Sequence, residues 1–142
     1  MRWKSLLLVL LVTLAPPLAE YGLLWRRWEP WGTLFPAVSA PIWPLMALSL
    51  WLMLPQVTYH PRDILMHIAA VLAGLVWPVT LLCQQAPGLS CLWLTAWGAL
   101  LALAAWQRWS TSRPAAALAL SASALALGLG AYLGFLAAGC LA

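Results

Sequence analysis

The chain has 142 residues, of which 65% are hydrophobic and only 7% are charged, and its formal net charge is +4 at pH 7. A water-soluble domain carries about a quarter charged residues, so this composition argues against a soluble globular protein. The seven Lys and Arg residues are scattered rather than clustered, which argues against nucleic acid as a partner and leaves the lipid bilayer as the expected medium.

Apolar stretches of about twenty residues, each long enough to cross a bilayer, are found along the whole chain. They predict an all-α, polytopic transmembrane helical bundle that forms a single domain over residues 1–142 with minimal loops. We expect five spans, near residues 5–24, 34–54, 64–83, 91–106 and 115–138. Four spans are the alternative, in which the first apolar segment enters the membrane and returns to the same side.

The first expected span follows a short basic start and is rich in leucine, as a secretory signal peptide is. The proline that follows Ala15 disfavours cleavage there, and apolar residues continue to Leu24. We therefore expect a retained span that is kinked at Pro16 and Pro17, because each proline removes a backbone donor.

Glu20 is the one acidic residue inside an expected span. An ionised carboxylate is costly in a bilayer, so it must be protonated, paired or turned to water. It is a candidate proton or cation site, or one half of a salt bridge to a partner subunit. The structural interpretation, which we favour at this point, is a carboxyl that reaches the interface or pairs with Arg26 or Arg27.

The second expected span carries Pro36, Pro41 and Pro44 in its first half. That half is expected to be bent or partly unwound, and neighbouring groups must then satisfy the freed carbonyls. A broken span can line a transport site, but a bent structural helix is the favoured interpretation.

Asp63 precedes the third expected span as a helix N-cap would, and His67 follows four residues later on the same helical face. The pair could begin a proton path or hold a quinone headgroup; the favoured alternative is an N-cap above a hydrogen-bonded histidine. His60 and His67 are the only histidines, and both fall at one end of one span. Haem would therefore need a ligand from a partner, and no metal site is expected.

Cys83 and Cys91 bracket the hairpin between the third and fourth expected spans. A disulfide between them would link these spans, although spacing alone leaves open whether the two residues come within reach. The chain has no CxxC motif, which argues against a thiol oxidoreductase.

The last expected span contains no charged residue and repeats a small side chain at every fourth position. Such a stripe predicts close packing against another helix, since backbones approach where Cβ atoms are small or missing. The helix-packing residues are Ala122, Ala126, Gly130, Gly134 and Ala138.

The Lys and Arg residues favour one orientation of the five spans. With a cytoplasmic N-terminus, five of them fall on the inner side and only Arg26 and Arg27 fall outside, which predicts a C-terminus outside. We expect an integral membrane protein of a bacterial-type inner membrane.

Known catalytic motifs are missing from the sequence, so we do not expect enzymatic activity from this chain alone. The favoured hypothesis is a non-catalytic accessory or structural subunit of a larger membrane complex (respiratory, transport or envelope assembly), with other integral membrane subunits as partners in a hetero-complex rather than a homo-oligomer. The alternative is a small oligomeric transporter or channel. A weaker alternative is a redox subunit that shares haem or quinone with a partner; the sequence itself requires no cofactor.

Overall fold

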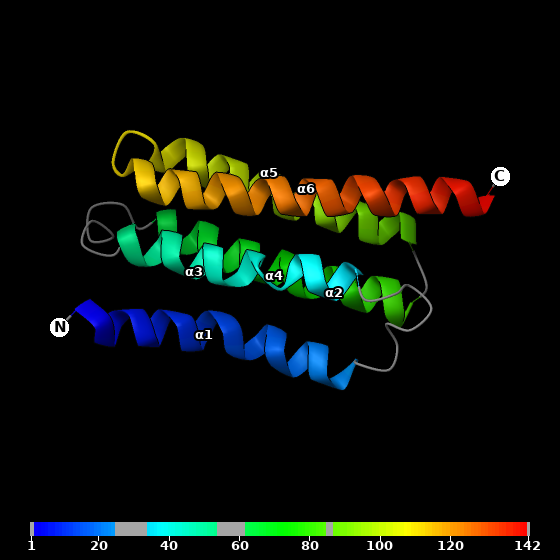
Figure 1. The fold of residues 1–142 in the computed structure, drawn as a ribbon, viewed down its shortest axis with the longest axis horizontal. Coiled ribbons are helices and arrows are strands. Elements are labelled where there is room, and N and C mark those ends of the chain that lie inside the picture. The colour runs from blue at the N-terminus through cyan, green and yellow to red at the C-terminus, as the bar shows by residue number, and fades with distance from the viewer. Residues whose placement is uncertain (1, 25–33, 54–61, 85–86, 142) are drawn as a thin grey trace.

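The chain folds into a bundle of long, roughly parallel and antiparallel helices (Figure 1). The computed structural model describes residues 2–24, 34–53, 62–84 and 87–141, and the regular secondary structure of these residues is all helical. In chain order the helices are α1 (Arg2–Leu23), α2 (Leu34–Ser39), α3 (Ile42–Met53), α4 (Arg62–Leu82), α5 (Pro87–Arg108) and α6 (Arg113–Leu141).

Five helical segments are long and apolar enough to cross a membrane, with α2 and α3 together forming the second. The all-α bundle of five spans is thereby confirmed. The N- and C-termini lie at opposite ends of the bundle, as an odd number of passes requires (Figure 1). The four-span alternative is wrong, because α1 is one continuous helix that does not turn back.

Helix α1 passes through Pro16 and Pro17 without interruption. Each proline lacks the N–H that would bond to the carbonyl four residues earlier, so two hydrogen bonds are missing from this turn. Thr13, in the turn before, is buried and bonds to α4 through its hydroxyl. Side-chain bonds to a neighbouring helix help a membrane helix to tolerate internal prolines.

The second span is broken between α2 and α3, as its prolines predict. Ala40 lies at the break, and Pro41 disfavours a helical conformation for the residue before it. Pro44 falls in the first turn of α3, where the backbone N–H has no intrahelical partner in any case. The Ala40 amide bonds to the Pro36 carbonyl, at 3.0 Å, so the short helix α2 is closed before α3 begins.

Three tryptophans fill the centre of the bundle. Trp43, Trp77 and Trp97 come from α3, α4 and α5 and are at most 2% exposed. The rings of Trp43 and Trp97 contact each other with centroids 5.1 Å apart. Gly74 of α4 makes room for both, since a Cβ there would lie 2.7 Å from an atom of Trp97 and 2.8 Å from Trp43. The aromatic centre therefore depends on one glycine.

The stripe of small residues on α6 packs against other helices of the same chain, and its two glycines face α5. Ala122 and Ala126 are fully buried, and a Cβ on Gly130 would lie 3.3 Å from Cβ of Leu94. A Cβ on Gly134 would lie at the same distance from Sγ of Cys91. Ala138, the last member of the stripe, is exposed. The predicted close packing thus takes place within this chain, so the stripe is not evidence for a partner subunit.

Candidate functional site

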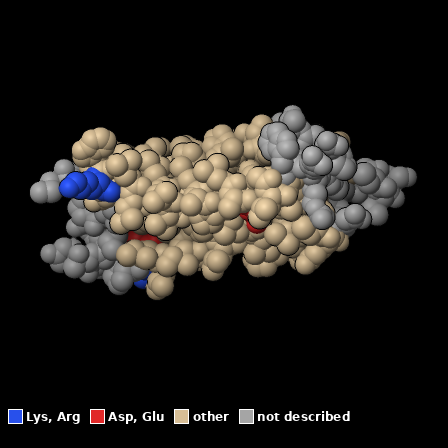
Figure 2. Space-filling model, turned by 90° about the horizontal axis from the view of Figure 1, so that it is seen from below, with Lys and Arg blue, Asp and Glu red and all other residues tan. Residues whose placement is uncertain are grey.

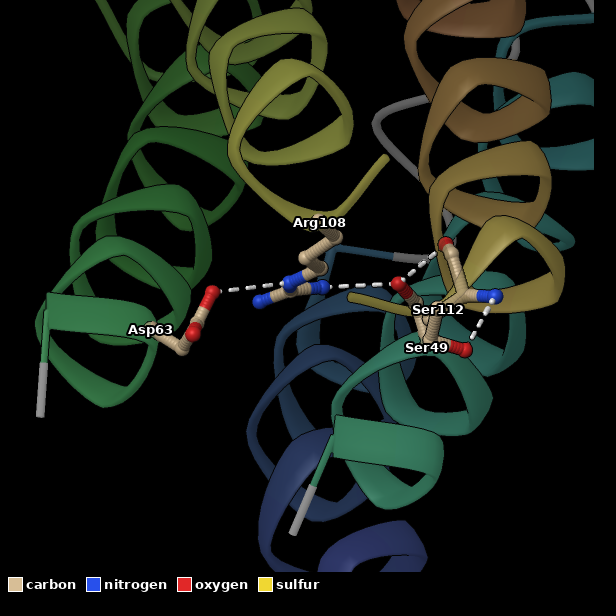
Figure 3. Close-up of polar contacts among 5 residues, drawn as sticks. Ser49, Asp63, Arg108 and Ser112 are labelled. Carbon is tan, nitrogen blue, oxygen red and sulfur yellow. Dashed lines mark hydrogen bonds and ion pairs between the residues drawn. The ribbon is translucent and has the colours of Figure 1, made fainter. Parts of the chain in front are cut away.

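A buried ion pair connects α4 to α5 near the end of the bundle that holds the N-terminus (Figures 1 and 3). Arg108, in the last turn of α5, donates from Nε to Oδ1 of Asp63 in the first turn of α4, at 3.1 Å. Their side chains are only 3% and 6% exposed. Removing two charges from water is costly, so each needs the other to remain ionised there.

The ion pair continues into a network that reaches two further helices (Figure 3). Nη1 of Arg108 donates to Oγ of Ser49 on α3, at 2.7 Å, and Ser49 in turn donates to the Ala115 carbonyl of α6, at 2.7 Å. Oγ of Ser112 accepts from the Ala115 amide and caps α6. Four helices therefore meet at one polar cluster, which we call the Arg108 cluster: Ser49, Asp63, Arg108, Ser112 and Ala115.

Asp63 and His67 share the expected helix, but they do not act on each other as the sequence suggested. Helix α4 begins at Arg62, so Asp63 lies within its first turn rather than at its N-cap, and its Oδ1 faces Arg108. His67 is buried, and its Nε2 lies 3.0 Å from Oγ1 of Thr13 on α1. Each of the two side chains thus joins α4 to a different helix.

This placement gives no support to the haem or quinone hypothesis. Nε2 of His67 is already hydrogen-bonded inside the protein, and a metal ion would have to displace Thr13 to reach it. His60 lies outside the described residues. Within the described part of the chain, no three His, Cys, Asp or Glu side chains are grouped closely enough to hold a metal ion.

Glu20 lies far from the Arg108 cluster, toward the other end of α1. It lines a groove of about 380 Å³ between α1 and α4, together with Pro16, Leu23, Leu75 and Val79 among others. Its Oε1 is buried and has no hydrogen-bond partner in the described part of the structure. Arg26 and Arg27, with which we expected it to pair, lie outside the described residues. The structure therefore does not bring Glu20 together with Asp63 and His67 into one site.

The break between α2 and α3 is tied to the residue that follows Glu20. The Tyr21 hydroxyl on α1 lies 2.7 Å from Oγ of Ser39, the last residue of α2. Ser39 is fully buried and also donates to the Pro36 carbonyl, at 3.4 Å. The break between α2 and α3 is thus linked to the residue that follows Glu20, because Tyr21 is hydrogen-bonded to Ser39.

Cys83 and Cys91 are both free thiols. Cys83 is exposed beyond the end of α4, whereas Cys91 points to α6 and donates to the Gly130 carbonyl, at 3.2 Å. The disulfide between them that the sequence left open is therefore not formed in the structure. The sulfur of Cys91 instead belongs to the contact between α5 and α6.

Three residues that the structure joins to the predicted ones were not predicted from the sequence: Arg108, Ser49 and Thr13. Arg108 was expected in the loop after the fourth span, where it was used only to predict which side of the membrane that loop faces. One signal was available, because Asp63 and Arg108 were predicted at the same side of consecutive spans, where opposite charges can meet. Serine and threonine carry no such signal, since they are common in membrane helices.

Comparisons with protein-family models, with curated proteins and with solved structures found no match to this chain.

Proposed function

We propose that this chain is a non-catalytic subunit of a larger membrane protein complex, and that Glu20 pairs with a basic side chain on a transmembrane helix of another subunit. The observation that carries the proposal is that Oε1 of Glu20 is buried in the groove between α1 and α4 without a hydrogen-bond partner among the described residues. The other described ionisable groups inside the bundle, in the Arg108 cluster and at His67, are engaged with neighbouring helices.

Helix α1 is held loosely by the rest of the bundle. In the most apolar 18-residue stretch of α1, only 11% of the residues are buried. In the corresponding stretches of the other four spans, 39–44% of the residues are buried. Leu18 and Leu23 on this helix are 70% and 85% exposed. Apolar exposure needs no partner in lipid, but an ionised carboxylate does, because hydrocarbon offers it neither water nor a countercharge. A partner helix against this groove would supply both contact area and charge.

We also propose an orientation, with the N-terminus in the cytoplasm and the C-terminus outside. Its support is that Lys4, Arg62 and Arg113 are exposed at the end of the bundle that holds the N-terminus. Figure 2 shows the described surface of one face almost without charge, with Lys and Arg gathered at one end. Positive charge of this kind favours the cytoplasmic side. The further assignment to a bacterial-type inner membrane rests on the sequence alone.

A small oligomeric transporter or channel is the second candidate, and the helix break favours it. The α2–α3 break is bonded to Tyr21, beside Glu20, and broken helices next to an intramembrane carboxylate are common at transport sites. Against it stands the filled centre of the bundle, where Trp43, Trp77 and Trp97 occupy the space that a path through one chain would need.

The first prediction tests the groove by site-specific photo-crosslinking in native membranes. A photoreactive residue at Leu23, which lines the groove, should crosslink to a transmembrane segment that contains Lys or Arg. The same residue at Leu103, which is 48% exposed on α5, is the matched control and should not give this product. We expect Glu20→Gln to reduce the yield at least about tenfold, since the charge pair is lost.

Two further variants separate a charge pair from general damage. Glu29→Gln makes the same chemical change outside the described residues and should leave the crosslink unchanged. Glu20→Lys should abolish the complex, and Lys or Arg→Glu on the crosslinked partner segment should restore it. A crosslink that survives Glu20→Gln, or that forms equally from Leu103, would contradict the proposal. Solute uptake by the purified chain alone in liposomes, lost in Glu20→Gln, would favour the transporter.

A further inference from the structure

A second groove, of about 490 Å³, lies between the last turns of α5 and the first turns of α6. Alanines form its floor, including Ala105 and Ala116, which are 6% and 1% exposed. Trp106 and Trp109 also line it and are 81% and 53% exposed. The groove exists because small side chains leave space between two helices, next to two indoles that both come from α5.

The groove has a polar end and an apolar end. Trp109 and Ser110 lie where α5 ends, whereas Ala102 and Leu120 lie about two helical turns further into the bundle. At the polar end, the Arg113 guanidinium carbon lies over the Trp109 ring, 5.3 Å from its centroid. A cation and two indoles at the end of a membrane helix are typical of the headgroup level of a bilayer.

Within the part of the chain that the structure describes, the positive charge at this end of the bundle is not balanced by exposed acids. Lys4, Arg62 and Arg113 are exposed there. Of the two acidic residues in the described part of the chain, Asp63 is buried against Arg108 and Glu20 lies toward the opposite end of α1. The potential at the polar end of the groove is therefore positive, which favours an anionic ligand.

We propose that this groove binds an anionic phospholipid, with its phosphate paired to Arg113 and the first part of one acyl chain lying on the alanine floor beside Trp106 and Trp109. The apolar lining matches the chain, and Arg113 matches the headgroup. This inference is independent of the function proposed for Glu20, which lies on other helices.

The test compares lipid binding by the purified chain, with native mass spectrometry in detergent as the measurement. Phosphatidylglycerol and phosphatidylcholine with identical acyl chains are the two probes. We expect the intact protein to prefer phosphatidylglycerol by about fivefold, the effect typical of one basic residue at a membrane surface. Arg113→Gln, a change at an exposed position, should abolish the preference.

Two variants locate the site. Arg62→Gln removes an exposed charge at the same end of the bundle but outside the groove, and should leave the preference unchanged. Ala102→Leu places a larger side chain in the groove without altering charge, and should weaken the binding of both lipids. Equal binding of the two lipids by the intact protein would overturn the proposal. An equal loss in Arg62→Gln, or displacement of the lipid by inorganic phosphate alone, would also overturn it.

Discussion

Asp63 and Arg108 are 45 positions apart in the sequence and meet with almost no exposure to solvent. Such a pair adds little net stability compared with apolar residues of the same size, but the loss of one partner leaves the other buried and uncompensated. Arg108 is the more demanding of the two, because its Nη2 has no hydrogen-bond partner in the described residues even when Asp63 is present. The residues of the Arg108 cluster therefore depend on one another.

The second prediction concerns this dependence. Asp63→Asn should lower the free energy of unfolding by about 3 kcal/mol, because Arg108 then stays buried without a countercharge. Denaturation of the protein in mixed micelles, followed by tryptophan fluorescence, measures the change. The double variant Asp63→Asn with Arg108→Gln should recover at least half of the loss, and the exposed change Arg62→Gln is the control. If the loss of unfolding free energy in the double variant equals the sum of the losses in the two single variants, the residues act independently.

At the scale of helices, packing is controlled by a few positions without a side chain. Gly74 faces two rings, and a Cβ on Gly98 would lie 2.5 Å from Cγ of Leu127 and 3.2 Å from its backbone nitrogen. Gly128 of α6, in contrast, has no atom within 4 Å of a Cβ built on it. Glycines in this bundle thus divide into those that allow close contact and those that face open space.

The third prediction follows from that division. Gly74→Ala should destabilise the protein by about 1–3 kcal/mol, because Trp43 and Trp97 are large, buried rings with little freedom to move away. Gly128→Ala should change stability by less than about 1 kcal/mol. The measurement is the same micelle denaturation for both variants. If the two changes cost the same, the aromatic centre would not be packed as tightly as the contacts imply.

At the scale of the whole molecule, five passes place the two ends of the chain on opposite sides of a membrane (Figure 1). Exposed Cys83 lies past the C-terminal end of α4, at the end of the bundle opposite to Lys4. This arrangement can be tested without knowledge of any partner.

The fourth prediction is therefore one of accessibility. In sealed vesicles, a membrane-impermeant maleimide should label Cys83 from one side only, and a cysteine introduced as Lys4→Cys in a cysteine-free background from the other side only. Labelling is read from the mass of the intact protein, and vesicles opened by detergent serve as the control. Labelling of both positions from the same side would contradict the five-span topology.

The spans were predictable from the sequence because hydrophobicity is a property of each stretch by itself. The break at Ala40 was predictable for the same reason, since Pro41 acts on its own neighbour. The pairing of His67 with Thr13, or of Arg108 with Ser49, depends on how far each helix is rotated about its axis, and the sequence of one helix does not contain that rotation. Helix α5 also reaches Arg108, beyond the expected end near residue 106, because the buried pairing allows a charge within its last turn.

The order of synthesis gives the Arg108 cluster a further consequence. Asp63 leaves the ribosome first, and for 45 residues its countercharge does not yet exist. The Ala115 carbonyl that completes the network arrives later still, with α6. During insertion Asp63 must remain in contact with water at the bilayer surface. The Arg108 cluster is therefore completed only after α6 has begun to enter, while the opposite end of the bundle can already be assembled.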